Sequence, residues 1–216
     1  MAYISFQPKD YFNTLLYTGT GSSLALTGVG FQPDMVWQKV RSTTSSHRIT
    51  DAVRGVGQVI YPNDTAQQSA ESAVTAFGTD GFTVGTAGGT NTSGATYVGW
   101  SWKAGGGQGS SNTDGSINTT YTSVNTTAGI GITTYTGNGS DQATYGHGLG
   151  VQPSMIWTLS LTSSDHRTSS AWRSGVTLFS EQVGIDAVGD AFGASNAGSG
   201  KVEGGSSTVF TLGTDP

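Results

Sequence analysis

Two His-Arg pairs, His47-Arg48 and His166-Arg167, carry the residue types that could do acid–base chemistry. Asp51 and Arg54 follow the first pair, and Asp165 precedes the second. A catalytic histidine needs a carboxylate that orients it and a nucleophile beside it. Ser and Thr are so frequent in this chain that a hydroxyl near either pair carries no information. We therefore interpret each pair as a group that hydrogen-bonds a loop or faces a partner, and we predict no catalytic residue.

The metal-binding hypotheses are weaker still. The chain has no cysteine and three histidines, so a zinc site would have to combine His47, His147 and His166, which show no H-x-x-x-H spacing. Asn112, Asp114 and Gly115 resemble the start of a calcium loop, but the closing Glu of the twelve-residue pattern is absent. We expect an Asx turn there, and no metal or cofactor site.

The chain repeats an ordered set of landmarks. Residues 28–37 read G-V-G-F-Q-P-D-M-V-W, and residues 148–157 read G-L-G-V-Q-P-S-M-I-W, an offset of 120. The turns Y-T-G-T-G-S (17–22) and Y-T-G-N-G-S (135–140) are offset by 118. The His-Arg pairs, and Arg54 with Arg173, are offset by 119, and F-T-V-G-T (82–86) with F-T-L-G-T (210–214) by 128. Nearly constant spacing indicates an internal duplication of a domain-sized unit.

Carboxylates and tryptophans suggest two kinds of sugar site. Glycoside cleavage needs two carboxylates that flank one cleft. None of the three glutamates has a counterpart in the other copy, so we predict no depolymerase activity: Glu71, Glu181 and Glu203. Four tryptophans could form a sugar-stacking platform, but a Trp on an alternating strand is more often part of the core, which is the assignment we favour: Trp37, Trp100, Trp102 and Trp157.

The composition excludes several classes of partner. Gly accounts for 34 of 216 residues, charged residues for 11%, and the net charge is −5. The nine Lys and Arg residues form no stripe, so we expect no nucleic-acid partner. No apolar run reaches 18 residues, and the first ten residues do not read as a signal peptide, so we expect no membrane span. The 10% aromatic content provides material for a core.

Short apolar stretches predict strands. Residues 34–40 place Val36 and Val40 on one face, and residues 154–159 are their counterpart in the second copy. Residues 97–103 form the clearest strand, with Val98, Trp100 and Trp102 on one face. Residues 131–136 lead as a strand into the Gly-Asn-Gly turn at 137–139. Because Pro lacks a ladder donor, Pro33 and Pro153 should stand at the starts of equivalent strands.

One stretch supports two interpretations. Residues 65–68 begin like a capping box and predict a short helix near 65–72. The following residues predict a hairpin instead, from 74–77 through the turn at 78–81 to 82–85, because Asp-Gly between apolar runs favours a tight turn.

Many short strands with frequent turns predict an all-β protein of two tandem antiparallel β-sandwich domains, jelly-roll or lectin-like, with a barrel as the alternative. We expect the first copy, with an N-terminal segment, at 1–103, a Gly/Ser/Asn-rich linker at 104–128, and the second copy at 129–216. Residues 193–207 are expected to be a loop insertion. After 210–214 the second copy has no counterpart of strand 97–103, so a strand from elsewhere should complete it, either Tyr3–Phe6 or a segment of a neighbouring chain.

Several motifs together resemble a repeat found in virion proteins of marine tailed phages, including cyanophages. They are F-Q-P-D-M-V-W (31–37), D-G-F-T-V-G (80–85), Y-V-G-W-S-W-K-A-G-G (97–106), S-N-T-D-G-S-I (111–117) and the opening I-S-F-Q-P-K-D-Y-F-N-T (4–14). The resemblance covers nearly the whole chain and brings no catalytic residue with it. It implies a structural protein exposed on the virion: a tail fibre, a tail-associated protein or a capsid decoration.

These observations lead to one expected function and one alternative. We expect a non-enzymatic virion structural protein, a capsid decoration or a knob or fibre component, that binds other virion proteins and forms a homo-oligomer. The chain has no coiled-coil stalk, which favours the small decoration or knob. The alternative is a receptor-binding or carbohydrate-binding fibre module that recognises a host-surface glycan.

Overall fold

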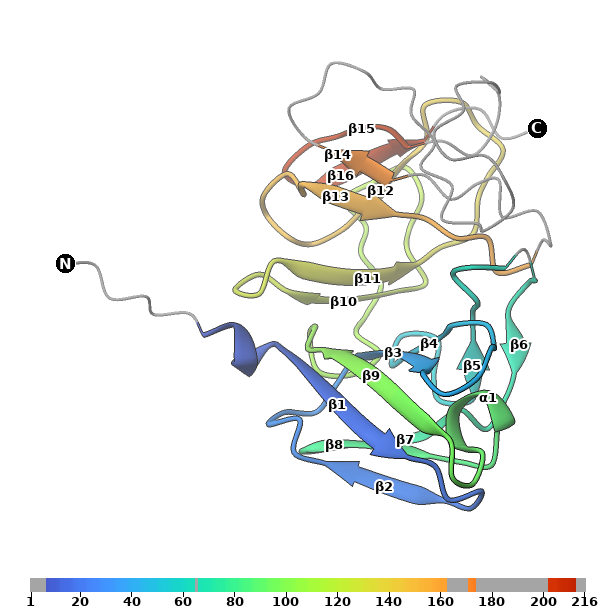
Figure 1. The fold of residues 1–216 in the computed structure, drawn as a ribbon. Coiled ribbons are helices and arrows are strands. Elements are labelled where there is room, and N and C mark those ends of the chain that lie inside the picture. Colours follow the sequence, from blue (N-terminus) through green and yellow to red (C-terminus); the bar gives the residue numbers. More distant parts are fainter. Residues whose placement is uncertain (1–6, 65, 163–170, 174–201, 213–216) are drawn as a thin grey trace. The chain divides into compact units, whose positions relative to one another are not determined.

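A computed structural model describes residues 7–64, 66–162, 171–173 and 202–212 of the chain (Figure 1). The described residues form an all-β protein, and every paired strand is antiparallel to its neighbour. The chain divides into two compact units. The first comprises Met1–Pro62 and Gln68–Gln108, and the second comprises Asn63–Gln67 and Gly109–Pro216.

The first unit contains a four-stranded and a three-stranded sheet (Figure 1). The four-stranded sheet has the order β1 (Phe12–Thr18), β9 (Thr96–Trp102), β3 (Met35–Val40) and β4 (Arg48–Asp51). The three-stranded sheet has the order β2 (Leu24–Thr27), β8 (Gly81–Val84) and β7 (Val74–Gly78). The remaining elements are short: η1 (Pro8–Asp10), β5 (Gln58–Val59), β6 (Ser69–Ala70) and α1 (Gly88–Asn91).

Both sheets of the first unit contribute to one hydrophobic core. Val36 of β3 packs there with Phe82 and Val84 of β8 and Val74 of β7, and all four are buried. Half-buried side chains of β1, β2 and β7 complete the cluster: Leu15, Tyr17, Leu24, Leu26 and Phe77. The two sheets therefore face each other, and each presents its other face outward.

Strand β9 turns a different face inward from the one that its sequence suggests. The buried residues Tyr97, Gly99 and Ser101 lie on the core side, and the half-buried Trp100 and Trp102 lie on the other. The prediction that these tryptophans belong to the core was wrong. The physical reason is volume: a Cβ atom on Gly99 would stand 3.1 Å from the Phe82 ring, so the bare backbone of β9 accommodates that ring.

The turn at 17–22 is held by the buried side chain of Asn91. Asn91 Oδ1 accepts a hydrogen bond from Thr20 N at 2.8 Å, and its Nδ2 donates to Ser22 O at 2.6 Å and Gly85 O at 2.7 Å. A Cβ atom on Gly19 would lie 2.3 Å from Thr92 O, so this close approach requires glycine.

The loop that follows β9 is held by a buried carboxylate. Asp34, fully buried, accepts hydrogen bonds from Ala104 N at 2.7 Å, Gly106 N at 3.0 Å and Gly107 N at 2.6 Å. Gly106 and Gly107 have φ of +85° and +117°, a region that favours glycine. The Gly-rich segment is thus a built part of the first unit rather than a free chain.

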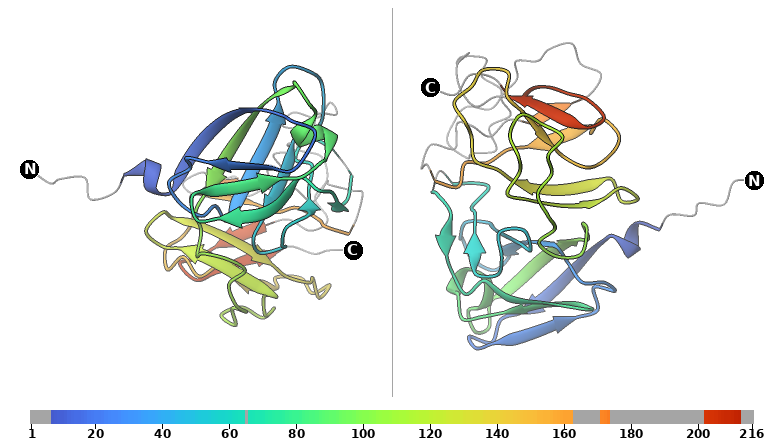
Figure 2. Two further views of the ribbon diagram at one scale, coloured as in Figure 1. Left: turned by 90° about the horizontal axis from the view of Figure 1, so that it is seen from below. Right: turned by 180° about the vertical axis from the view of Figure 1, so that it is seen from behind.

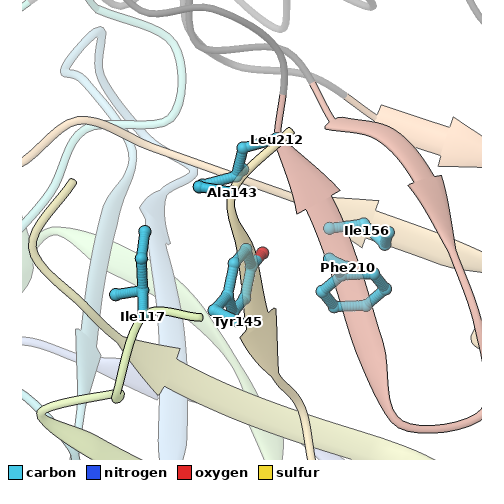
Figure 3. Packing of buried hydrophobic residues seen from close by; sticks show 6 residues of the cluster. All are labelled: Ile117, Ala143, Tyr145, Ile156, Phe210 and Leu212. Atoms are coloured by element: carbon cyan, nitrogen blue, oxygen red, sulfur yellow. The ribbon is translucent and has the colours of Figure 1, made fainter. Parts of the chain in front are cut away.

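The second unit consists of smaller sheets. β10 (Tyr121–Asn125) pairs with β11 (Ile130–Thr134), and β13 (Met155–Trp157) pairs with β14 (Ala171–Arg173). A three-stranded sheet has the order β12 (Thr144–Gly146), β16 (Val209–Leu212) and β15 (Val202–Gly205). Figure 3 shows the buried hydrophobic cluster of the second unit, which consists of Ile117, Ala143, Tyr145, Ile156, Phe210 and Leu212.

The three-stranded sheets of the two units share their register. In the first, Leu26 pairs with Phe82 and Phe77 pairs with Phe82; in the second, Tyr145 and Gly205 pair with Phe210 in the same way. Both outer strands carry an irregularity at the same place, between Val74 and Ala76 and between Val202 and Gly204. The register of the β13–β14 pair differs from that of the β3–β4 pair. Met155 pairs with Arg173, which aligns with Arg54 by the 119-residue offset, whereas Met35 pairs with Asp51, three residues before Arg54.

Part of the segment predicted as a linker, 104–128, is a strand. β10 pairs antiparallel with β11, which corresponds to β1 by the 118-residue offset, and β9 pairs antiparallel with β1. The second unit therefore obtains a partner for β11 from the residues that precede it in the chain. The proposed donor Tyr3–Phe6 lies outside the described residues, as do residues 193–201 of the expected loop insertion. Residues 202–205 of that stretch form β15, which pairs with β16, so the expectation of a loop was wrong there.

Local expectations had mixed outcomes. The hairpin is confirmed as β7 and β8, and Pro33 and Pro153 each stand two residues before a strand, β3 and β13 respectively. The short helix near 65–72 was wrong for the described residues of that stretch, where β6 pairs with β5. The backbone hydrogen bonds between β6 and β5 favour a strand, and they outweigh the weak preference for a helix that the spacing of the alanines gives.

We expect Asp34→Ala to lower the free energy of unfolding by about 3 kcal/mol or more, because three buried N–H groups lose a charged acceptor. Ser154→Ala is the matched control, since Ser154 aligns with Asp34 by the 120-residue offset and is exposed. Its effect should stay within about 0.5 kcal/mol. Urea unfolding followed by tryptophan fluorescence measures both, and equal effects would contradict the proposed role of Asp34.

Candidate functional site

The outer face of the four-stranded sheet collects aromatic side chains. Trp37 of β3 lies opposite Trp100 of β9, and Met35 lies opposite Trp102, which in turn lies opposite Phe12 of β1. These positions alternate with the core-facing ones along each strand, so their side chains share the face that points away from the core. We call the set Phe12, Met35, Trp37, Trp100 and Trp102 the aromatic face.

The aromatic face is internally packed yet accessible at its border. The rings of Phe12 and Trp102 have centroids 5.0 Å apart, and those of Trp37 and Trp100 are 6.1 Å apart at an edge-on angle. Phe12 is 37% exposed, and Leu16, two positions further along the same side of β1, is 64% exposed. Large rigid rings held in place by each other lose little conformational freedom on binding, which suits either protein docking or sugar stacking.

His47 adjoins this face as a hydrogen-bond acceptor. Trp37 Nε1 donates to His47 Nδ1 at 2.8 Å, and the two rings meet at an edge-on angle. Because indole N–H can only donate, Nδ1 must be unprotonated in this arrangement. Burial, and secondarily the positive charge of Lys39, lowers the pKa of His47, so the neutral form prevails near neutral pH.

Arg48, the neighbour of His47, joins a separate network. Its Nε donates to Glu71 Oε2 at 2.7 Å, and its Nη1 donates to Ser46 O at 3.0 Å in its own loop. Tyr61 OH also donates to Glu71, and its ring lies 5.5 Å from the Arg48 guanidinium carbon. Burial alone would raise the pKa of Glu71, but the hydrogen bonds from Arg48 and Tyr61 outweigh it and lower the pKa.

Asp51 and Arg54, the other charged residues near His47, pair with each other. Arg54 Nε donates to Asp51 Oδ2 at 2.6 Å, and both side chains are 5% exposed. Arg54 also donates to Gln68 Oε1 at 3.0 Å and Ile49 O at 3.1 Å. The ion pair therefore braces β4 against the loops that follow it, and the Asp51 carboxylate is directed to Arg54.

His147, in the second unit, is a buried structural histidine. Its Nδ1 accepts a hydrogen bond from Leu149 N at 3.1 Å, and its Nε2 lies 3.3 Å from Ser206 O, to which it can donate. Burial is the largest influence and lowers the pKa of His147. Both ring nitrogens thus have backbone partners that link the turn after β12 to the turn before β16.

The remaining candidate residues form a local turn or lie outside the described part of the chain. Asp114 N donates to Asn112 Oδ1 at 2.9 Å, which confirms the Asx turn. No group of three acidic or histidine side chains among the described residues is placed to hold a metal ion. Four candidates of the second copy lie outside the described residues: Asp165, His166, Arg167 and Glu181.

Phe12 and Met35 were not predicted as members of the aromatic face, and Trp37, Trp100 and Trp102 were considered as a sugar platform but assigned to the core. The missed signal was the offset of 118 residues: strand 131–136 was predicted in the second copy, and its counterpart β1 follows from the same spacing. Which face of β1 points outward depends on the core packing of Leu15 and Tyr17.

The described part of the chain contains no helix that is long and apolar enough to cross a membrane. In the comparisons with known proteins, the model of one family, described as a domain of unknown function (DUF7483), matches residues 7–216. No curated protein and no solved structure matches the chain.

We expect His47 to make the first unit less stable in acid. Its native pKa lies below the unfolded value of about 6.5, so the unfolded state binds more protons in this range and stability rises with pH. The contribution is present above about pH 6.5 and is lost as the pH falls through the native pKa. Protonation would also break the bond from Trp37.

Urea unfolding between pH 8 and pH 4 tests this, with His47→Gln as the comparison because His147 adds its own pH dependence. The difference between the two proteins should shrink as the pH falls. Proton NMR titration of His47 in Lys39→Gln should give a higher midpoint than in the parent protein, because one cause of the lowered pKa is removed. An unchanged midpoint would contradict the role given to Lys39.

Proposed function

We propose that this chain, which belongs to the DUF7483 family, is a non-enzymatic structural protein exposed on the surface of a tailed-phage particle. Two observations support this role: the motif resemblance to marine phage virion proteins, and the aromatic face on the four-stranded sheet of the first unit. An outward sheet face with packed tryptophans beside exposed Phe12 and Leu16 suits docking of another protein. The partners would be capsid or tail proteins, and the role that of a decoration or knob.

We propose further that the two units are copies of one β-sandwich. The matched register of the β2-β8-β7 and β12-β16-β15 sheets supports this, as does the shared irregularity in their outer strands. The glycines of the repeated G-x-G loops also agree in conformation: Gly28 and Gly148 have φ of +94° and +70°, and Gly30 and Gly150 have +88° and +72°.

The bonding of the acid–base candidates is consistent with a non-enzymatic role. His47 accepts from Trp37, Arg48 and Glu71 pair with each other, and so do Asp51 and Arg54. The Trp37–His47 and Arg48–Glu71 contacts link separate segments of the first unit, and Arg54 does so through Gln68, as is typical of structural side chains. Removing one partner would leave the other polar group partly buried without its hydrogen bond, at a cost in stability.

Immunogold labelling of intact particles with antibodies raised against this chain tests the proposal. We expect gold on the particle surface, and its position on heads or tails separates a decoration from a knob or fibre component. Antibodies adsorbed with the purified chain are the control. Absence of label on particles that infect normally, together with detection of the chain only in the lysate, would contradict a virion role.

The aromatic face also favours a second candidate, binding of a host-surface carbohydrate. Sugars stack on exposed aromatic rings, and Phe12 and Trp102 present such a surface. A glycan array with the purified chain should then reveal a ligand whose affinity falls about tenfold or more in Trp102→Ala. Val56→Ala, at an exposed apolar position that is not part of the aromatic face, should bind normally. An array without binding would exclude the glycans it displays and favour the protein-docking role.

A further inference from the structure

In the described part of the chain, no strand pairs with the outer edge of β1. This strand ends the four-stranded sheet, and β9 occupies only one of its sides (Figures 1 and 2). Lys103 N donates to Tyr11 O, and Gly19 N donates to Ala95 O, so the odd-numbered residues of β1 direct their backbone groups to β9. The backbone groups of Phe12, Thr14, Leu16 and Thr18 therefore point to the free side.

Natural sheet edges are usually protected by charged residues, Pro, bulges or short length. β1 is seven residues long, reads F-N-T-L-L-Y-T, and pairs with β9 in an unbroken register. Its one local device is the side chain of Asn13, whose Oδ1 accepts from Thr14 N at 2.8 Å. The edge is thus a template for another strand, whose pairing would replace the bond between Thr14 N and Asn13 Oδ1.

The exposed side chains of β1 indicate what that strand is. Of the three exposed large apolar side chains in the described part of the first unit, Phe12, Leu16 and Val56, two lie on β1, four residues apart. In an antiparallel pair of two β1 strands with Thr14 opposite Thr14, each Phe12 lies directly opposite Leu16 of the second copy. Phe12 of each copy is then covered by Leu16 of the other copy, and this contact occurs twice in the symmetric pair. The paired residues include no charged side chain. The two-fold symmetry gives a closed dimer.

We propose that a second copy of the chain pairs antiparallel with the free edge of β1 and joins the two four-stranded sheets into one. The two-fold axis of such a pair is perpendicular to the sheet, so the two aromatic faces lie on the same side of the combined sheet, with Phe12 packed against Trp102 in each copy. Strand addition of this kind gains affinity from main-chain hydrogen bonds and specificity from the alternating side chains. This inference stands whether or not the chain belongs to a virion.

A strand pair that joins residues 12–16 of each copy is a small interface, so the dimer should be weak and concentration-dependent. Sedimentation velocity of the full chain over a wide concentration range should show a monomer–dimer equilibrium. Leu16→Lys should weaken association at least about tenfold, since burial of an unpaired ammonium at the strand pair is unfavourable. Val56→Lys, which adds the same charge at the other exposed apolar position of the unit, should associate like the parent chain.

Amide hydrogen exchange locates the interface independently of the variants. The amides of Phe12 and Leu16 should exchange fast in dilute solution and slowly at high concentration, while the amides of β2 should not change. A chain that stays monomeric at all concentrations would overturn the proposal. So would a dimer whose β1 amides remain unprotected, and so would β1 amides protected equally at every concentration, since another segment of the same chain would then cover the edge.

Discussion

The contact of the Phe82 ring with Gly99 decides which face of β9 points to the core of the first unit. Because β9 offers no side chain at that point, the ring of β8 enters the space between the sheets and the Tyr97–Ser101 side of β9 becomes the core side. Alternation then forces Trp100 and Trp102 outward, next to Trp37 and Phe12. The aromatic face follows from this one contact, and with it both functional hypotheses for the chain.

A chain with few charges uses its carboxylates and amides to hold loops. Asp34 gathers three N–H groups of the segment after β9, Asp80 accepts from Gly28 N and Gly30 N, and Asn91 holds the turn at 17–22. Loops rich in glycine lose much conformational entropy when they become ordered. Fixed acceptors offset part of that cost, and this explains how Gly-rich stretches become defined parts of the unit.

The second unit pairs β11 with a strand from the stretch whose composition predicted a linker. β11 aligns with β1 by the 118-residue offset, yet β11 pairs with β10 from the segment that precedes it, whereas β1 pairs with β9 from far downstream. The backbone of β11 requires a partner on that side whichever part of the chain supplies it, because unpaired ladder groups are costly when buried. Composition alone had suggested a linker there, because Gly, Ser and Asn dominate the start of that segment.

The sequence by itself determined the all-β class, the strands at 34–40 and 97–103, the hairpin at 74–85 and the places of Pro33 and Pro153. Those features are local, since residue type, alternation and turn chemistry act over a few neighbours. The inward face of β9, the partner of β11 and the division of His47 and Arg48 between two networks were decided by the tertiary structure. Each depends on residues far apart in the chain, such as Phe82 with Gly99 or Arg48 with Glu71, and their contact is established only when the sheets pack.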